Sequence, residues 1–132
     1  MYLFIRNHPF SIVTCVIIWV LCFIDVPDTP LGNISLIDKW THIAMYLGLC
    51  GIIWIERLRA CAYIYNKVWM SFWACLVPLL MGGLIEILQA NCTGGRRSGD
   101  WVDFLADGIG VALAQVICIP LARLLAKRHK DS

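Results

Sequence analysis

The chain has 132 residues, of which 60% are hydrophobic and 15% are charged, and its formal net charge at pH 7 is +2. Soluble globular domains are about half apolar and about one quarter charged, so this composition excludes an ordinary soluble domain and predicts apolar surface that faces lipid. The small net charge, with no basic patch interleaved with aromatic residues outside the C-terminal tail, excludes nucleic acid as an expected partner. No linker-like stretch divides the sequence, which predicts a single domain over residues 1–132.

Four apolar runs follow one another along the chain. They extend approximately from Pro9 to Ile24, from Trp40 to Ile55, from Val68 to Gln89 and from Trp101 to Leu125. Each approaches or exceeds the roughly 17 to 25 residues with which a helix crosses the hydrocarbon core, the second run being the shortest. Backbone groups in lipid have to be paired, and these runs lack the alternation of barrel strands. The sequence therefore predicts an all-α fold, a polytopic membrane bundle of four transmembrane helices.

Basic residues between and beside the runs predict the orientation of the bundle. The connection over residues 56–67 carries Arg57, Arg59 and Lys67, and short basic loops lie on the cytoplasmic side of a membrane. Arg6 and the basic C-terminal tail then fall on that same side, as an even number of crossings requires. Both termini are accordingly predicted to be cytoplasmic.

Two turn-rich stretches, over residues 25–39 and 91–100, are left on the external side. The second stretch contains Arg96 and Arg97, which oppose the topology signal of the other basic residues. We therefore expect these two arginines to serve a purpose other than orientation.

Ionisable and amide side chains gather at one depth of the predicted bundle. They are Asp38 and His42 at the start of the second helix, Glu86 and Gln89 at the outer end of the third, and Asp100, Asp103 and Asp107 at the start of the fourth. Spacings of three or four residues within each group place its members on one helix face. All seven fall in the outer half of the membrane or just above it, where such groups face a bundle interior or a wet cavity.

A purely structural interpretation accounts for part of this pattern. Asp38 is a candidate N-cap, and Asp100 and Asp103 can stabilise a helix N-terminus through its dipole. Glu86 and Asp107 are not explained in this way, because they lie within helices and need partners. The available donors are Arg96, Arg97, His42 and Gln89, and Gly82, Gly83, Gly108 and Gly110 are expected to let the third and fourth helices approach closely enough for such pairs.

Three motifs of the chain resemble the signatures of the VanZ-like family of bacterial membrane proteins, in the same order. They are Asp38-Lys39-x-x-His42, Glu86-x-x-Gln89 and Arg97-x-x-Asp100-x-x-Asp103-x-x-x-Asp107-x-x-Gly110. The resemblance extends from about Asp38 to the end of the fourth run, and the first run matches only in position. Asp107 stands where many members have Asn. The family spacing favours Arg97 over Arg96 as the arginine that faces the site.

The resemblance implies a single VanZ-like transmembrane domain in the bacterial inner (cytoplasmic) membrane, with a link to the low-level teicoplanin resistance of the family's namesake. It implies no mechanism. Together with the residue pattern, it predicts an external site that binds or modifies an anionic cell-envelope component, such as the head group of a lipid-linked cell-wall precursor. The expected binding residues are Asp38, His42, Glu86, Gln89, Arg97, Asp100, Asp103 and Asp107.

Each type of side chain has a chemical role in this hypothesis. An arginine would bind phosphate or carboxylate, and His42 could exchange a proton near neutral pH. Glu86, Asp100 and Asp103 would orient these donors or hold a divalent cation. The sequence contains no nucleophile–base pair or HExxH motif, so whether the chain is an enzyme, and with which cofactor, stays open.

Two other functions fit the same residues. The first is a proton-coupled small transporter or lipid flippase in which Glu86 and Asp107 titrate, which would require an oligomer because four helices are few for alternating access. The second is a non-catalytic structural membrane protein whose polar network only locks the bundle. Membrane lipids are expected partners in every case.

Overall fold

The computed structural model describes residues 2–24, 35–94 and 100–131. These residues form the α-helices α1 (Tyr2–Asn7), α2 (Pro9–Phe23), α3 (Ser35–Ala60), α4 (Lys67–Cys92) and α5 (Trp101–Lys130), and they contain no β-strand. The predicted all-α fold is confirmed for this part of the chain. The last four helices cover the predicted apolar runs, and α3 is much longer than its run because it continues through charged residues at both ends.

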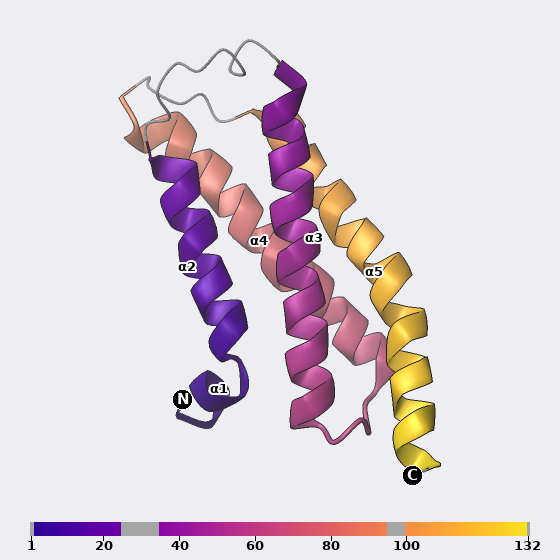
Figure 1. Ribbon diagram of the computed structural model, residues 1–132. Helices are drawn as coiled ribbons and strands as arrows, with labels where there is room; N and C mark the ends of the chain where they lie inside the picture. The colour runs from indigo at the N-terminus through magenta and orange to yellow at the C-terminus, as the bar shows by residue number, and fades with distance from the viewer. Residues whose placement is uncertain (1, 25–34, 95–99, 132) are drawn as a thin grey trace.

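The helices define two ends of the molecule (Figure 1). One end, called the site end below, holds the last residues of α2 and α4 and the first residues of α3 and α5. The other, called the terminal end, holds both chain termini and the turn between α3 and α4. Because α3 and α5 both start at the site end, they run parallel to each other, with α4 antiparallel to both.

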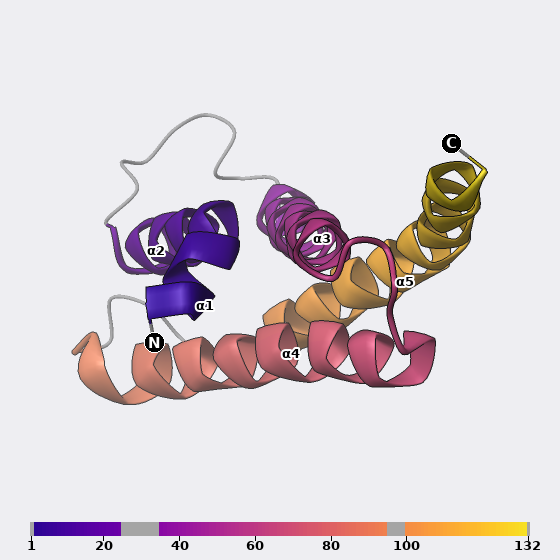
Figure 2. The ribbon, with the colours of Figure 1, turned by 90° about the horizontal axis from the view of Figure 1, so that it is seen from below.

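Helix α3 packs most extensively against α5 and also contacts α2 and α4, whereas α4 lies across one side of the bundle (Figure 2). Gly110 makes the contact between α3 and α5 very close. A Cβ atom at Gly110 would lie 2.5 Å from the Ile43 carbonyl oxygen and 3.1 Å from the Leu47 backbone nitrogen. The expected contact of this glycine between the last two helices is not found, because Gly110 faces α3 instead.

Local chemistry accounts for two of the helix starts. The Asn66 side chain accepts a hydrogen bond from the Trp69 backbone N–H at 3.1 Å and caps α4. The Asp100 side chain accepts one from the Val102 backbone N–H at 2.9 Å and caps α5. Such caps satisfy backbone donors that have no partner within the helix. The cap at Asp100 fixes where α5 begins and so positions Asp103 and Asp107.

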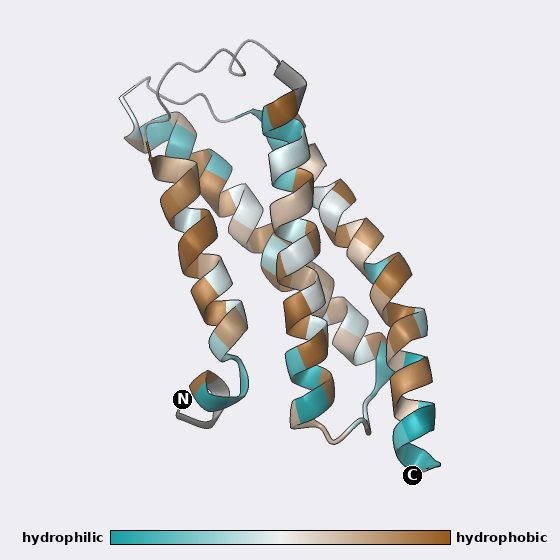
Figure 3. Cartoon of the chain, in the orientation of Figure 1, coloured by the Kyte–Doolittle hydropathy of each residue, from teal (hydrophilic) through white to brown (hydrophobic). Residues whose placement is uncertain are grey.

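The interior between the two ends is apolar and falls into two clusters. The cluster nearer the site end contains Ile18, Cys22, Tyr46, Leu49, Cys50, Ile85, Val111 and Ala114. The cluster nearer the terminal end contains Trp54, Leu58, Met70, Ala74, Cys118 and Ala122. Polar side chains are concentrated beyond these clusters, towards the two ends, as the hydropathy colouring shows (Figure 3).

Much of the outward-facing surface of the helices is also apolar. Large exposed hydrophobic residues include Val16 and Val20 on α2, Leu80 and Ile87 on α4, and Val116 and Leu121 on α5. Helices α4 and α5 are long and apolar enough to cross a membrane, and α2 is a shorter apolar helix. The charges of Lys39 and Glu56 flank the apolar part of α3. Length and composition thus identify two candidate membrane spans among the described residues.

The close contact at Gly110 predicts that a larger side chain at this position lowers the stability of the protein. The substitution Gly110→Ala should lower the free energy of unfolding by about 1–3 kcal/mol, because the new methyl group would overlap the α3 backbone. Gly51→Ala is the matched control, since a Cβ at Gly51 meets no atom within 4 Å. Thermal unfolding of the purified protein in detergent measures both variants. Equal melting temperatures for the two would contradict the packing described for α3 and α5.

Candidate functional site

The centre of the polar site is a buried pair between α3 and α5. His42 Nδ1 lies 2.8 Å from Asp107 Oδ1, and the two side chains are 5% and 1% exposed. Parallel helices in close contact bring the first turns of α3 and α5 to the same depth, which is why residues 65 positions apart in sequence can pair. The carboxylate orients the imidazole ring, so His42 is fixed in direction as well as in position.

A second pair of contacts between the same helices lies nearer the site end. The Lys39 ammonium group is 3.1 Å from Asp100 Oδ2 and also contacts Asp103 Oδ1. The backbone N–H of Val102, and after it the Lys39 ammonium, hold the pKa of the Asp100 carboxyl group below its usual value. Lys39 is one turn before His42, so its face of α3 carries two groups that meet carboxylates of α5.

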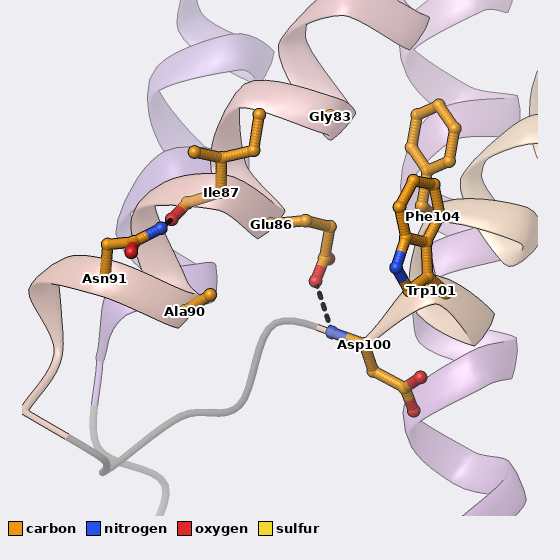
Figure 4. A pocket seen from close by; sticks show the side chains of 8 residues that line it. All are labelled: Gly83, Glu86, Ile87, Ala90, Asn91, Asp100, Trp101 and Phe104. Atoms are coloured by element: carbon orange, nitrogen blue, oxygen red, sulfur yellow. Dashed lines mark hydrogen bonds between the residues drawn. The ribbon is translucent and has the colours of Figure 1, made fainter.

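Glu86 brings α4 into the site. Its Oε2 atom accepts a hydrogen bond of 2.9 Å from the backbone N–H of Asp100 (Figure 4). Its Oε1 atom is buried and has no hydrogen-bond partner among the described residues. A buried polar atom without a partner is costly and calls for an explanation. Glu86 is therefore tied to the start of α5 by one oxygen and leaves the other available to a ligand.

A cavity of about 270 Å³ opens beside Glu86, between the last turns of α4 and the first turn of α5 (Figure 4). Its lining includes Gly83, Ile87, Trp101 and Phe104, together with Glu86 and Asp100. The walls are thus largely apolar, with two carboxylate side chains among them. Ile87 and Trp101 are themselves strongly exposed, so the cavity lies at the side of the bundle.

The other predicted site residues are placed as follows. Asp38 is exposed, and its carboxylate belongs with His42 and Asp103 to a group whose potential ligand atoms lie within 4.8 Å of one another. The Gln89 amide nitrogen is directed elsewhere. It donates a hydrogen bond of 2.7 Å to the Cys22 carbonyl oxygen and so ties α4 to α2. Arg97 lies outside the described residues.

Sequence reasoning missed two residues of the site. Lys39 belongs to the first motif but was not counted among the binding residues, although its spacing of three from His42 indicated a shared face. Tyr46 is one turn further along and is 1% exposed. A Cβ at Gly82 would lie 2.6 Å from Asp107 Oδ2 and 3.1 Å from the Tyr46 hydroxyl, so Gly82 leaves room for both groups.

A separate polar cluster at the terminal end was also missed. The Glu56 carboxylate accepts hydrogen bonds from the backbone N–H groups of Phe10 at 2.7 Å and Ser11 at 3.1 Å, and from the Ser11 hydroxyl. His8 Nδ1 lies 3.6 Å from Glu56 Oε2. A carboxylate at a helix N-terminus satisfies free N–H groups and complements the dipole. This cluster therefore holds the start of α2 against α3.

The charges of the described residues define what the site can bind. Its carboxylates are those of Asp38, Glu86, Asp100, Asp103 and Asp107, and its cationic or ionisable partners are Lys39 and His42. The His42, Glu86 and Asp107 side chains are all buried, and their potential ligand atoms lie within 4.8 Å of one another. Carboxylate and imidazole groups arranged in this way can exchange protons or coordinate a cation.

Comparisons of the chain with protein-family models, with curated proteins and with solved structures found no match.

Proposed function

We propose that this chain is a four-span, VanZ-like protein of the bacterial cytoplasmic membrane whose site end faces outward and binds or modifies an anionic, lipid-linked component of the cell envelope. One observation carries the proposal. The cavity beside Glu86 combines apolar walls with carboxylates that belong to the polar cluster of α3 and α5.

This combination suits an amphipathic ligand. Ile87, Trp101 and Phe104 offer apolar contact to a lipid chain that enters from the side of the bundle. The head group of such a ligand would then lie beside Glu86 and Asp100, where Lys39, paired with Asp100, supplies a positive charge and a further cation is needed to offset the carboxylates. His42 is the group that would exchange a proton in any modification of the head group, because Asp107 orients its ring.

The four-span arrangement extends the two candidate spans to α2 and α3. Apolar residues exposed on α2 and apolar residues at the middle of α3 continue the apolar zone of α4 and α5 between the two polar ends (Figure 3). The last turns of α3 and α5 at the terminal end are basic, with Arg57 and Arg59 on α3 and Lys127, Arg128 and Lys130 on α5. Basic residues favour the cytoplasmic side, so this orientation puts the site end outside.

The apolar interior favours a site that opens at one end of the bundle and argues against a transport path through it. Below His42 and Asp107, the core towards the terminal end is mainly apolar, with residues such as Trp54, Leu58 and Met70. Its polar groups include the Gln115 amide, which accepts a hydrogen bond from Trp54 Nε1 at 3.1 Å, and the Ser71 hydroxyl. A proton-coupled transporter would require a continuous path of polar groups or water along this half of the bundle. A buried histidine–carboxylate pair alone is also compatible with transport, but its position at one end of an apolar core favours binding from that end.

Two native cysteines test the orientation. Cys92 is exposed at the site end of α4, and Cys61 follows α3 at the terminal end with intermediate exposure. We expect a membrane-impermeant maleimide to label a variant that keeps only Cys92 in intact spheroplasts, and to label one that keeps only Cys61 after permeabilisation. Detergent-solubilised samples provide the control for reactivity. Labelling of Cys61 alone in intact cells would reverse the orientation.

The binding proposal is tested with the full chain in nanodiscs. Wild-type protein should retain a lipid-linked cell-wall precursor in preference to neutral phosphatidylcholine, as measured by native mass spectrometry. His42→Gln and Lys39→Met should reduce this preference, because each removes a charged or ionisable group from the α3 face of the site. His129→Gln is the control, since the His129 ring contacts Tyr63 at the terminal end, away from the site.

Folding and physiology separate a binding role from a structural one. Circular dichroism and membrane yield should be the same for His42→Gln and the wild type, while teicoplanin resistance conferred by expression of the chain is lost only in the variant. Equal retention of the precursor and the neutral lipid by the wild type would refute the proposal. Parallel loss of yield and resistance would instead assign the polar network to bundle stability.

A further inference from the structure

We propose that His42, Glu86 and Asp107 form a binding site for one divalent transition-metal ion, of which Zn²⁺ and Mn²⁺ are the best candidates. The site deepens the proposed function, on which its biological role rests, because the ion would supply the positive charge that an anionic head group needs at this position. The coordination itself is inferred from geometry, burial and charge.

The geometry suits coordination by three helices. His42 comes from α3, Glu86 from α4 and Asp107 from α5, and their potential ligand atoms all lie within 4.8 Å of one another. The 2.8 Å between His42 Nδ1 and Asp107 Oδ1 is a hydrogen-bond distance, whereas two ligand atoms each about 2.1 Å from a tetrahedral zinc ion lie about 3.4 Å apart, so the two side chains would separate slightly to admit the ion. Small movements of these side chains would complete the site.

The unpaired oxygen of Glu86 is the independent observation that points to a ligand. The residue is only 8% exposed, and its Oε1 atom has no hydrogen-bond partner among the described residues. A carboxylate oxygen buried without a partner carries a desolvation cost that a cation would offset. The second oxygen already accepts the Asp100 backbone N–H, which fixes the direction of the carboxylate.

The charges around the site favour a cation over a further anion. Lys39, the lysine of this cluster, is engaged by Asp100 and Asp103 and forms no ion pair with Glu86 or Asp107 among the described contacts. Two buried carboxylates therefore share one imidazole as their ionisable partner. A divalent ion would balance both charges and leave positions open for oxygen atoms of a bound phosphate or carboxylate.

The donor set indicates the class of ion. Imidazole nitrogen suits zinc and other transition metals, and carboxylate oxygen suits manganese as well. Magnesium and calcium prefer sites made entirely of oxygen ligands. A metal would replace the proton shared by His42 and Asp107, so its affinity should increase as the pH rises and its binding should release protons.

The test uses the full-length, tag-free chain, since an affinity tag of histidines would itself bind metal. Isothermal titration in nanodiscs with ZnCl₂ and with MnCl₂ should show one saturable site per chain for at least one ion. Co²⁺ added to the metal-free wild type should give a visible absorption spectrum typical of mixed nitrogen and oxygen coordination. Absence of both saturable binding and this spectrum in the wild-type protein would be enough to overturn the proposal.

Two variants of the same chemical type locate the site. Glu86→Gln keeps an oxygen acceptor for the Asp100 N–H but loses the charged ligand, and we expect its metal affinity to fall at least about tenfold. Glu56→Gln makes the same change at the terminal end, where Glu56 caps α2, and should leave metal affinity unchanged. Circular dichroism checks the fold of both. Wild-type affinity in Glu86→Gln would show that the ion is bound elsewhere and would refute this site.

The outcomes separate this inference from the proposed function. Saturable metal binding without preference for the lipid-linked precursor would uphold the ion site and refute the proposed ligand. Preference for the precursor in EDTA-treated protein, with no metal binding, would uphold the ligand and refute the ion site. If both hold, added Zn²⁺ or Mn²⁺ should strengthen precursor binding by the wild type and not by Glu86→Gln.

Discussion

The parallel contact between α3 and α5 is the constraint on which the rest of the structure depends. Gly110 lets the two backbones meet at the carbonyl oxygen of Ile43, one residue beyond His42. At this separation a short aspartate side chain can reach the imidazole ring, which gives the 2.8 Å contact of Asp107 with His42. A wider helix separation would leave both groups buried without a partner, at a cost of several kcal/mol in an apolar interior. Packing and polar chemistry at this contact therefore depend on each other.

Polar contacts at the two ends of the bundle hold α2 against its neighbours. At the terminal end, Glu56 of α3 caps the N-terminus of α2. At the site end, Gln89 of α4 binds the Cys22 carbonyl oxygen at the end of α2. Helix α2 is thus fixed at both ends by polar contacts to different neighbours, although most of its surface is apolar. The site itself is formed by contacts among α3, α4 and α5.

The sequence predicted the helices well because long apolar runs have few alternatives. It also assigned Asp38, Glu86 and Asp107 to one end of the bundle, and the structure has them at that end. Periodicity shows which residues share a face but not which helix that face meets. Gln89 was consequently assigned to the binding residues, whereas its amide nitrogen bonds the backbone of α2.

The same limitation explains the other differences. Lys39 lies in a motif of which only the aspartate and the histidine were counted as binding residues. The role of the lysine could not be predicted, because it depends on the register of α3 against α5. Gly110 could be recognised as a small residue that permits close approach, but the partner helix follows from the parallel arrangement and not from the spacing. The predicted role of Arg97 concerns a residue outside the described ones and stays a prediction.

The balance of charge at the site end limits which ligands the site can bind. A lysine engaged by two aspartates is partly neutralised, so its attraction for an anion is weaker than that of an unpaired lysine. Glu86 and Asp107 would repel an anion outright if no cation lay between. Recognition of an anionic head group here therefore requires a positive charge in addition to Lys39, supplied by an arginine, by a bound metal ion or by a proton on His42. Among these, a metal ion would satisfy the unpaired oxygen of Glu86 and also contact all three helices at once.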